Sequence, residues 1–425
     1  MQNPSVMRKQ YSHLVQLPML ACILLFFSGC LKDKLTKTYK IIYPVYEEKS
    51  TVLANIKANK PAAIGKPGKI FLYGNYIFLN EIDKGVHIID NSNPSSPVNV
   101  AFINIPGNLD IAVKGSTLYA DFYTDLLAID ISNPLQAKMG KLLRRIFPER
   151  QWTNGFNPDS NRVIVGWIEK DTTVTIERDG RPIGIGWGCA NCMFAADANS
   201  SGNKSSVPGI AGSMSRFALV NDYLYAVNQS TLNAISVANP GDPVFASANW
   251  VGWNIETVYP FKDKLFIGSS TGMFIFDIGN AANPERRGSF THARACDPVV
   301  ADDKYAFVTL RTGSFCDGTS NQLDVVNVED VYSPRLVKTY GLTNPHGLAK
   351  DGNLLFICDG KDGLKVYDAG NVSNLNLLQH IKGMETYDAI AWNKRLLVVT
   401  TEGLRQYDYS DLNSIKLLST IVTGK

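Results

Sequence analysis

Short apolar stretches separated by polar turns run along most of this chain, and one such unit recurs at nearly constant spacing. Its clearest part is an apolar strand that ends in Asp and runs into a Ser-Asn-Pro turn, as in IIDNSNPSSP (88–97) and AIDISNP (128–134). Because Asn, Asp and Ser side chains bond the backbone of their own turn and Pro presets φ, each unit predicts a locally specified turn. The residues that end these strands, called marker residues below, are Asp90, Asp130, Ser236, Asp277, Asn327, Asp368 and Asp408.

Each unit contains four apolar segments of strand length. In the last unit these are YDAIAW (387–392), RLLVV (395–399), GLRQYDY (403–409) and IKLLSTI (415–421). The alternation of apolar and polar residues within them is loose, which is typical of a sheet covered on both faces. Repeats of this length made of four short strands predict an all-β fold, the β-propeller, in which each repeat is one blade.

The spacing of the marker residues sets the predicted number of blades. Most steps are 40 or 41 residues (130 − 90 = 40, 277 − 236 = 41), but the step from Asp130 to Ser236 is 236 − 130 = 106 residues. We interpret this gap as a degenerate third blade, RVIVGWIEKD (162–171) and TTVTIERD (172–179), followed by an insertion at 180–212. The prediction is eight four-stranded blades in a propeller domain at 67–425, with seven as the alternative if the degenerate unit does not close.

The first residues predict a targeting signal rather than a part of the fold. Residues 1–29 read as a signal peptide, because Arg8 and Lys9 precede an apolar stretch, 17–27, that is too short to span a bilayer. The sequence FSGC ending at Cys30 resembles a bacterial lipobox, although Phe27 stands where Leu is usual. This resemblance implies acylation of Cys30 and a lipid-anchored protein of the bacterial cell envelope. Leu31, rather than Asp, after the cysteine implies the outer membrane, and residues 30–66 predict a tether and an N-terminal element.

Charge is nearly balanced over the chain, with 42 Lys and Arg against 39 Asp and Glu. No basic patch interleaved with aromatic residues is present in the sequence, which argues against a nucleic-acid partner. We therefore expect attachment to a membrane through the lipid on Cys30, no nucleic acid, and a monomer.

The repeats resemble the LVIVD family, whose propeller-like repeats occur in bacterial surface proteins. The resemblance rests on GVHIIDNSNP, LLAIDISNP and GLKVYDAGN and covers residues 68–425. The chain also looks like a Bacteroidetes-type family of surface lipoproteins of unassigned activity, through INIPGNLDIAVKG and CDPVVADDKYAFVTLRTG. The resemblance implies a fold and a location but no reaction.

One column of residues stands just before or at the start of each predicted innermost strand, where it should ring the mouth of a central channel. Aligning the units on their second strands places in it Gly68, Asp110, Asn154, Ser215, Glu256, Asp297, His346 and Asp388. One interpretation is a polar mouth that binds a ligand, with Ca²⁺ as a candidate held by Glu256, Asp297 and Asp388, since hard cations prefer oxygen ligands. The other is structural: each side chain caps backbone N–H groups at the start of its own strand.

The cysteines favour disulfides over a metal site. Once Cys22 and Cys30 are set aside, five cysteines remain in a compartment that permits disulfides. We expect one disulfide between Cys296 and Cys316, which lie on one face of one predicted blade, and a second between Cys189 and Cys192 within the insertion. A single CxxC lacks the second pair that structural zinc needs. Cys358 is then left as a buried apolar residue.

The sequence favours a binding protein for a protein or glycan partner, and it assigns no catalytic residue. Aromatic residues near the predicted mouth, Trp250, Trp253 and Tyr387, are consistent with binding and equally with blade packing. The alternative is a Ca-dependent propeller hydrolase, lactonase-like or phytase-like, with Asn154 added to the Ca²⁺ ligands. That alternative rests on analogy of fold alone. The sequence contains no GxSxG, HExxH or phosphate-loop motif.

Overall fold

The computed structural model describes residues 35–158, 161–176, 209–292, 298–312 and 320–424. The described chain divides into two compact units. The smaller contains residues 35–43 and 168–176, which belong to the two paired strands β1 (Leu35–Glu48) and β11 (Arg162–Ile176). The larger contains all other described residues and holds the propeller.

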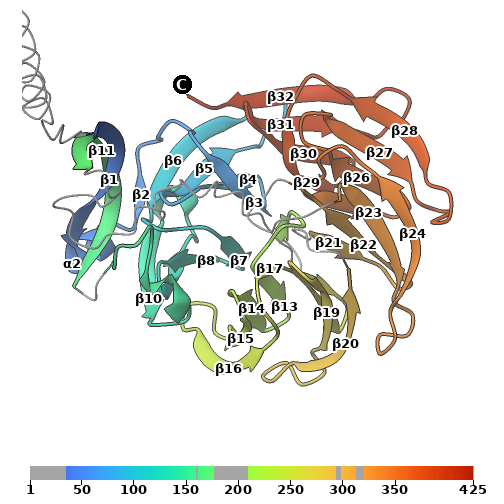
Figure 1. Cartoon of the computed structure of the whole chain (residues 1–425), viewed down its shortest axis with the longest axis horizontal. Helices are drawn as coiled ribbons and strands as arrows, with labels where there is room; N and C mark the ends of the chain where they lie inside the picture. Colours follow the sequence, from blue (N-terminus) through green and yellow to red (C-terminus); the bar gives the residue numbers. More distant parts are fainter. Residues whose placement is uncertain (1–34, 159–160, 177–208, 293–297, 313–319, 425) are drawn as a thin grey trace, which may run out of the picture. The chain divides into compact units, whose positions relative to one another are not determined.

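Seven sheets of the larger unit each contain four consecutive antiparallel strands and stand around a common centre (Figure 1). The innermost strands are β3 (Pro67–Tyr73), β7 (Ile111–Lys114), β13 (Phe217–Val220), β17 (Ile255–Phe261), β21 (Val299–Ala301), β25 (Leu348–Asp351) and β29 (Thr386–Trp392). The second strands are β4 (Tyr76–Glu81), β8 (Thr117–Phe122), β14 (Tyr223–Val227), β18 (Lys264–Ser269), β22 (Tyr305–Leu310), β26 (Leu354–Cys358) and β30 (Arg395–Thr400).

The outer two strands of each blade complete the sheets. The third strands are β5 (Gly85–Asp90), β9 (Asp125–Asp130), β15 (Thr231–Ser236), β19 (Gly272–Asp277), β23 (Gln322–Asn327), β27 (Leu364–Asp368) and β31 (Gly403–Asp408). The fourth are β6 (Val98–Asn104), β10 (Lys138–Leu143), β16 (Val244–Trp250), β20 (Glu285–Thr291), β24 (Arg335–Gly341), β28 (Asn376–Ile381) and β32 (Lys416–Val422). Inner strands such as β8 are buried along their length, whereas outer strands such as β24 are largely exposed.

The prediction of eight blades is wrong, and the alternative of seven is what the described residues form. The segment expected to be a degenerate blade forms the single long strand β11, which pairs with β1, and the short 3₁₀ helix η2 (Pro148–Gln151) precedes it. A blade needs four strands that can cover each other's edges, and the described residues of this segment supply one. The number of marker residues, seven, equals the number of blades, because each marker residue is the last residue of a third strand.

The marker side chains close the turns as their residue type predicts. Asp90 Oδ1 accepts a hydrogen bond from the Ser92 N–H at 2.9 Å, and Asp408 Oδ1 accepts one from the Ser410 N–H at 2.8 Å. Bonds of the same kind are made by Asp130, Asp277, Asn327 and Asp368. Hydrogen bonds from the turn favour the charged carboxylate and so lower the pKa of Asp90, Asp130 and Asp408. The pKa of Asp277 is lowered first by the hydrogen bond from Lys264 and then by the one from the Gly279 N–H. The turn is therefore specified within each repeat.

The first blade has a strand added at each edge. The outer addition is β2 (Ala58–Asn59), which pairs with β6 and follows the short helix α2 (Lys49–Ala54). The inner addition is β12 (Gly209–Ala211), which pairs with β3 in antiparallel register and contacts β7 and β29. Because β12 lies inside the ring of innermost strands, the chain itself occupies part of the centre (Figure 1).

Every blade is built from one continuous stretch of chain, so no strand is shared between the first and last blades. The ring closes instead through packing: Ile390, Leu397 and Val399 of the last blade lie in the same apolar core as Ile70 and Phe71 of the first. The Gly424 N–H also donates to the Ile64 carbonyl at 2.8 Å. In the described part of the chain, no helix has the length and apolar character needed to cross a bilayer.

Candidate functional site at the propeller hub

Strand polarity defines two faces of the propeller. The face at which the innermost strands begin, called the hub face, also carries the turns between second and third strands and the connections between blades. The opposite face, called the turn face, carries the marker turns. The predicted channel column lies on the hub face, since its members stand at the start of innermost strands.

A short stretch after β12, residues 212–216, crosses the centre and is called the hub segment. Ser213 Oγ accepts a hydrogen bond from the Leu348 N–H at 2.7 Å, and the Met214 carbonyl accepts one from Lys69 Nζ at 2.9 Å. The Arg216 N–H donates to Asp110 Oδ2 at 2.7 Å, and the Ser215 carbonyl accepts from the Val258 N–H at 2.5 Å. The hub segment thus bonds to blades on several sides of the ring and fills space that the sequence predicted to be a channel.

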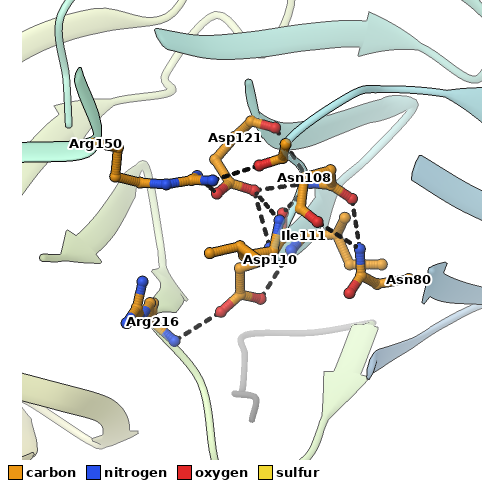
Figure 2. Close-up of polar contacts among 9 residues, drawn as sticks. Asn80, Asn108, Asp110, Ile111, Asp121, Arg150 and Arg216 are labelled. Atoms are coloured by element: carbon orange, nitrogen blue, oxygen red, sulfur yellow. Dashed lines mark hydrogen bonds and ion pairs between the residues drawn. The ribbon is translucent and has the colours of Figure 1, made fainter. Parts of the chain in front are cut away.

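Asp110 and Asp121 anchor a polar network between the first two blades and the hub segment (Figure 2). Asp121 Oδ1 accepts hydrogen bonds from the Leu109 N–H at 2.8 Å, the Asp110 N–H at 2.9 Å and Asn108 Nδ2 at 2.8 Å. Its other oxygen pairs with Arg150 of η2. Asp110 accepts from its own neighbour, the Ile111 N–H, at 2.7 Å. Both carboxylates therefore satisfy backbone groups at the start of β7.

The first blade joins this network through Asn80 and Lys69. Asn80 Nδ2 donates to Asn108 Oδ1 at 2.7 Å, which links the end of β4 to the connection before β7. Lys69 is fully buried, and burial lowers the pKa of its amine, opposed by the nearby carboxylates of Asp110 and Asp388. Burial also raises the pKa of Asp110, opposed by Lys69 and by the backbone N–H groups that Asp110 accepts from. Lys69 and Asp110 are therefore buried groups of opposite charge, and each partly offsets the effect of burial on the pKa of the other.

Asp388 is held against the hub segment by two glycines. Its Oδ1 accepts from the Ala389 N–H at 3.0 Å and lies 3.4 Å from Ser213 Oγ. A Cβ added at Gly212 or at Gly347 would overlap this carboxylate. The close approach therefore requires the absence of a side chain at both positions.

A second group of ionisable side chains stands on the other side of the hub. Burial raises the pKa of Glu256 to about 7, with Arg216, Arg311 and Lys69 acting in the opposite direction. Burial lowers the pKa of His346 to about 3, and the nearby Arg311 lowers it further, so this imidazole is neutral at pH 7. The His346 ring packs edge-on against Tyr387, with centroids 5.1 Å apart.

The structure brings some members of the predicted column together and separates others. Asp110 and Ser215 are in contact, with Ser215 Oγ 3.2 Å from Asp110 Oδ2, and Asp388 meets the hub segment beside them. Gly68 lies in β3, where a Cβ would overlap the Asn80 side chain. Asn154 belongs to no blade: with Gly155 it forms a two-residue turn at φ 49° and 79° between Thr153 and Phe156. Asp297 lies outside the described residues.

The cation and disulfide predictions involve residues outside the described part of the chain. Among the described residues, no group of three or more His, Cys, Asp or Glu side chains could hold a metal ion, but Asp297 is not among them. Cys189, Cys192, Cys296 and Cys316 also fall outside the described residues, so both disulfides stay predictions. Cys358 is a free, fully buried thiol whose pKa burial raises, as expected for an apolar packing residue.

The sequence analysis missed Lys69, Asn80 and Asp121, although a signal for two of them was present. The second strands end in polar residues: Asn80, Asp121, Ser269, Thr309 and Thr400 stand at or next to the hub end of their strands. A polar residue recurring where an apolar strand meets the hub face indicates a backbone-capping role. Lys69 gave no such signal, because its role depends on the hub segment arriving from a distant part of the chain.

Three exposed tryptophans lie on the hub face around the third blade and are called the tryptophan platform: Trp152, Trp250 and Trp253. Their exposed fractions are 64%, 60% and 73%. Trp152 follows η2, Trp250 ends β16, and Trp253 lies in the connection from β16 to β17. The sequence analysis singled out Trp250 and Trp253 but not Trp152.

A small cavity lies on the turn face at the seam between the last and first blades. Its volume is about 70 Å³, and its lining includes Asn75, Asn91, Trp392 and Arg395. Pockets that enclose a small-molecule ligand usually measure about 300–1,000 Å³, so this cavity is too small for a substrate.

Comparison with known proteins agrees with the repeat pattern. The model of the LVIVD repeat matches residues 64–104 and 108–139, which form the first two blades and the turns between them. The chain is thus a β-propeller whose first two repeats match the LVIVD repeat. No curated protein matches its sequence.

Solved structures are similar to this propeller in fold. A Lactobacillus plantarum protein matches 84% of this chain and 96% of its own, at 13% identity and a TM-score of 0.53. A periplasmic gluconolactonase of Pseudomonas aeruginosa, PpgL, matches 84% of this chain and 96% of its own, at 13% identity and a TM-score of 0.49. BamB of Moraxella catarrhalis matches 86% of this chain and 99% of its own, at 9% identity and a TM-score of 0.48. At these identities the first similarity supports the fold alone.

Proposed function

We propose that this protein is a lipid-anchored binding protein of the bacterial cell envelope and that its hub face holds the partner, a protein or a glycan. One observation carries the proposal. The ionisable groups at the hub bond to one another and to the backbone, whereas the same face presents three tryptophans that are more than half exposed.

The state of the hub carboxylates supports binding rather than catalysis. Asp110 and Asp388 are 1% and 4% exposed, and both accept hydrogen bonds from strand-start N–H groups. A general acid or base must reach the substrate within hydrogen-bond distance, directly or through one water. Asp110 and Asp388 cap the N–H groups that begin their innermost strands, which is the structural role considered in the sequence analysis.

The tryptophan platform supports a role for the hub face in binding. Exposed indole rings leave apolar area in water, and aromatic residues are enriched where proteins bind partners. Aromatic side chains on the turn face provide the comparison: Tyr332 is 69% exposed, but it stands alone in a marker turn.

The envelope location is proposed from the resemblance of residues 27–30 to a lipobox. Those residues lie outside the described part of the chain. An acyl chain adds roughly 0.8 kcal/mol per buried CH₂, so two or more chains would hold the protein lastingly on a membrane. We propose the outer membrane as the site of attachment, from Leu31 at the position after Cys30.

Retention on isolated envelopes tests the proposal. The chain from residue 31 onward, without its lipid, is mixed with cell envelopes of the source bacterium, and the sedimented fraction is measured. Trp152→Ala, Trp250→Ala and Trp253→Ala in one chain should reduce sedimentation to the level of an unrelated protein. The control Tyr332→Ala, on the turn face, should leave sedimentation unchanged. Equal sedimentation of all three chains would refute a binding role for the hub face.

A further inference from the structure

We infer that the tryptophan platform is a carbohydrate-binding site that takes a neutral oligosaccharide or an exposed segment of a polysaccharide. This inference rests on the proposed function and names the class of its ligand. It is carried by the rigid mounting of the three indoles and by the neutral amide side chains that surround them.

The two arms that carry the tryptophans are fixed to one turn. Asn228 Nδ2, at the turn between β14 and β15, donates to Glu149 Oε2 at 3.0 Å and so holds the arm that leads to Trp152. Two residues further on, the Ser230 carbonyl accepts from the Val251 N–H at 2.9 Å, between Trp250 and Trp253. Residues two apart are separated by at most about 7 Å, so the arms are mounted side by side.

Further hydrogen bonds restrict each arm. The Ile255 N–H donates to the Gln229 carbonyl at 3.1 Å, and the Asn254 carbonyl accepts from the Ser270 N–H at 3.0 Å. On the other arm, Thr153 and Phe156 exchange two backbone bonds of 2.8 and 2.9 Å across the turn that follows Trp152. Restriction before binding lowers the entropy that a ligand must overcome, which favours a preorganised site.

Four exposed residues beside the indoles are neutral and bear amides. They are Gln151, Asn154, Gln229 and Asn254. The charged groups nearest in sequence to Trp152 are already paired, since Glu149 accepts from Asn228 and Arg150 bonds to Asp121 and to the Gly107 carbonyl at 2.5 Å. The exposed Arg286 is engaged with the segment between Trp250 and Trp253, since its Nη1 donates to the Val251 carbonyl at 3.3 Å. Two other exposed arginines, Arg144 and Arg145, follow β10.

This combination fits a sugar. A pyranose ring presents an apolar face of C–H groups, which packs on an indole, and a rim of hydroxyls that both donate and accept. An amide side chain also donates and accepts, so it matches a hydroxyl without requiring a charge. Tryptophan suits such a place because the ring is apolar and its N–H still bonds a partner or water.

A protein partner would require a different surface. Stable protein interfaces bury roughly 800 Å² on each side and have a continuous apolar core inside a polar rim. Here exposed amides adjoin the indoles in the chain, Gln151 before Trp152 and Asn254 after Trp253. The surface therefore combines stacking positions with hydrogen-bonding groups.

Titration with defined oligosaccharides tests the inference. The chain from residue 31 onward is titrated, by calorimetry and by tryptophan fluorescence, with neutral oligosaccharides of glucose, mannose, galactose, xylose and N-acetylglucosamine. We expect at least one to bind at micromolar to millimolar concentration. Trp152→Ala, Trp250→Ala and Trp253→Ala should each weaken binding about 3- to 10-fold, the value expected for one aromatic stacking contact. Gln229→Ala should weaken binding also, and Tyr332→Ala should not.

Two results would overturn the inference: no member of the panel binds at millimolar concentration, or the binding seen is unaffected by all three tryptophan substitutions. Circular dichroism of each variant shows that the propeller is intact. Failure of this inference can be told apart from failure of the proposed function. If envelope retention still depends on the tryptophans but is abolished by protease treatment of the envelopes, the partner is a protein, and only the carbohydrate assignment falls.

Discussion

Gln406 and Asn91, 315 residues apart in the chain, donate a hydrogen bond to each other across the seam between the last and first blades. Gln406 Nε2 donates to Asn91 Oδ1 at 2.8 Å, and Asn91 Nδ2 donates to Gln406 Oε1 at 3.1 Å. At the seam between the third and fourth blades, where the chain is continuous, the Tyr225 hydroxyl donates to the Ala281 carbonyl at 2.9 Å. At the continuous seam between the sixth and seventh blades, Gln379 Nε2 donates to the Leu412 carbonyl at 3.0 Å. The amide pair thus stands at the one seam where no connecting chain keeps the two blades together.

Removal of this amide pair should weaken ring closure. We expect Gln406→Leu to lower the free energy of unfolding by about 1–3 kcal/mol, because Gln406 is fully buried and its loss leaves Asn91 without its amide partner. Urea unfolding measures the change. Tyr225→Phe, which removes one interblade bond at a continuous seam, is the matched control and should cost about 1 kcal/mol. If Gln406→Leu costs no more than this control, the pair does not secure the seam.

The approach of Asp388 to Gly347 predicts a strong effect of one methyl group. Gly347→Ala should lower the free energy of unfolding by about 1–3 kcal/mol, because the new Cβ overlaps the Asp388 carboxylate and Met214. Gly341→Ala is the control, since a Cβ there meets no atom within 4 Å. Adding Asp388→Ala to Gly347→Ala should recover part of the loss. A thermal unfolding series on the four chains measures this, and equal melting temperatures for Gly347→Ala and Gly341→Ala would contradict it.

Glu256 predicts a pH dependence of defined sign. Burial raises its pKa from 4.5 to about 7, so the folded protein binds the proton more tightly than the unfolded chain does. Stability is therefore lost as the pH rises from about 4.5 to 7, and the loss is complete above pH 7. Glu256→Gln removes the titration and should stabilise the protein by about 1–3 kcal/mol at pH 8 relative to pH 4.

The measurement for Glu256 is urea unfolding of wild type and variant at both pH values. Glu329→Gln, at an exposed glutamate, serves as the control and should give the same difference from wild type at pH 4 and pH 8. A Glu256→Gln chain less stable than wild type at pH 8 would show that the ionised carboxylate is favoured by its surroundings.

The marker turns predict that the acceptor atom matters and the charge does not. Asp368→Asn should leave stability nearly unchanged, because Asn327 already makes the same bond, 3.1 Å from its Oδ1 to the Glu329 N–H. Asp368→Ala should cost about 0.5–1.5 kcal/mol, since the Gly370 N–H then loses its acceptor. Chemical unfolding of the two variants decides, and an equal loss in both would assign the effect to charge.

The proposed lipid anchor predicts a change of compartment. Cys30→Ala in the full-length chain should abolish incorporation of labelled palmitate and move the protein from the detergent phase to the aqueous phase in phase-separation assays. Cys22→Ala, a cysteine within the predicted signal peptide, is the control and should retain both. Unchanged palmitate incorporation in Cys30→Ala would place the modification elsewhere.

The repeat could be predicted from the sequence because its information is local. Marker residues such as Asp90 bond within two residues of themselves, so their spacing numbered the third strands without any knowledge of the ring. The candidate site was predicted less well. Asp110 and Asp388 were placed at strand starts, but the column also admitted Asn154, whose Asn-Gly turn lies outside any blade. An ungapped alignment assigns a blade to every unit, including residues 162–176. In the structure these residues form β11, which pairs with β1 instead.

By itself, then, the sequence determined the repeating strands, their turns and the residues that begin each innermost strand, because these depend on hydrogen bonds between near neighbours in the chain. Only the tertiary structure decided that seven repeats close the ring and that residues 212–216 occupy its centre. It also decided that Lys69 bonds the Met214 carbonyl there and that Gln406 meets Asn91 at the seam. Those contacts join residues tens to hundreds of positions apart, and their energies arise only when burial and packing have brought the blades together.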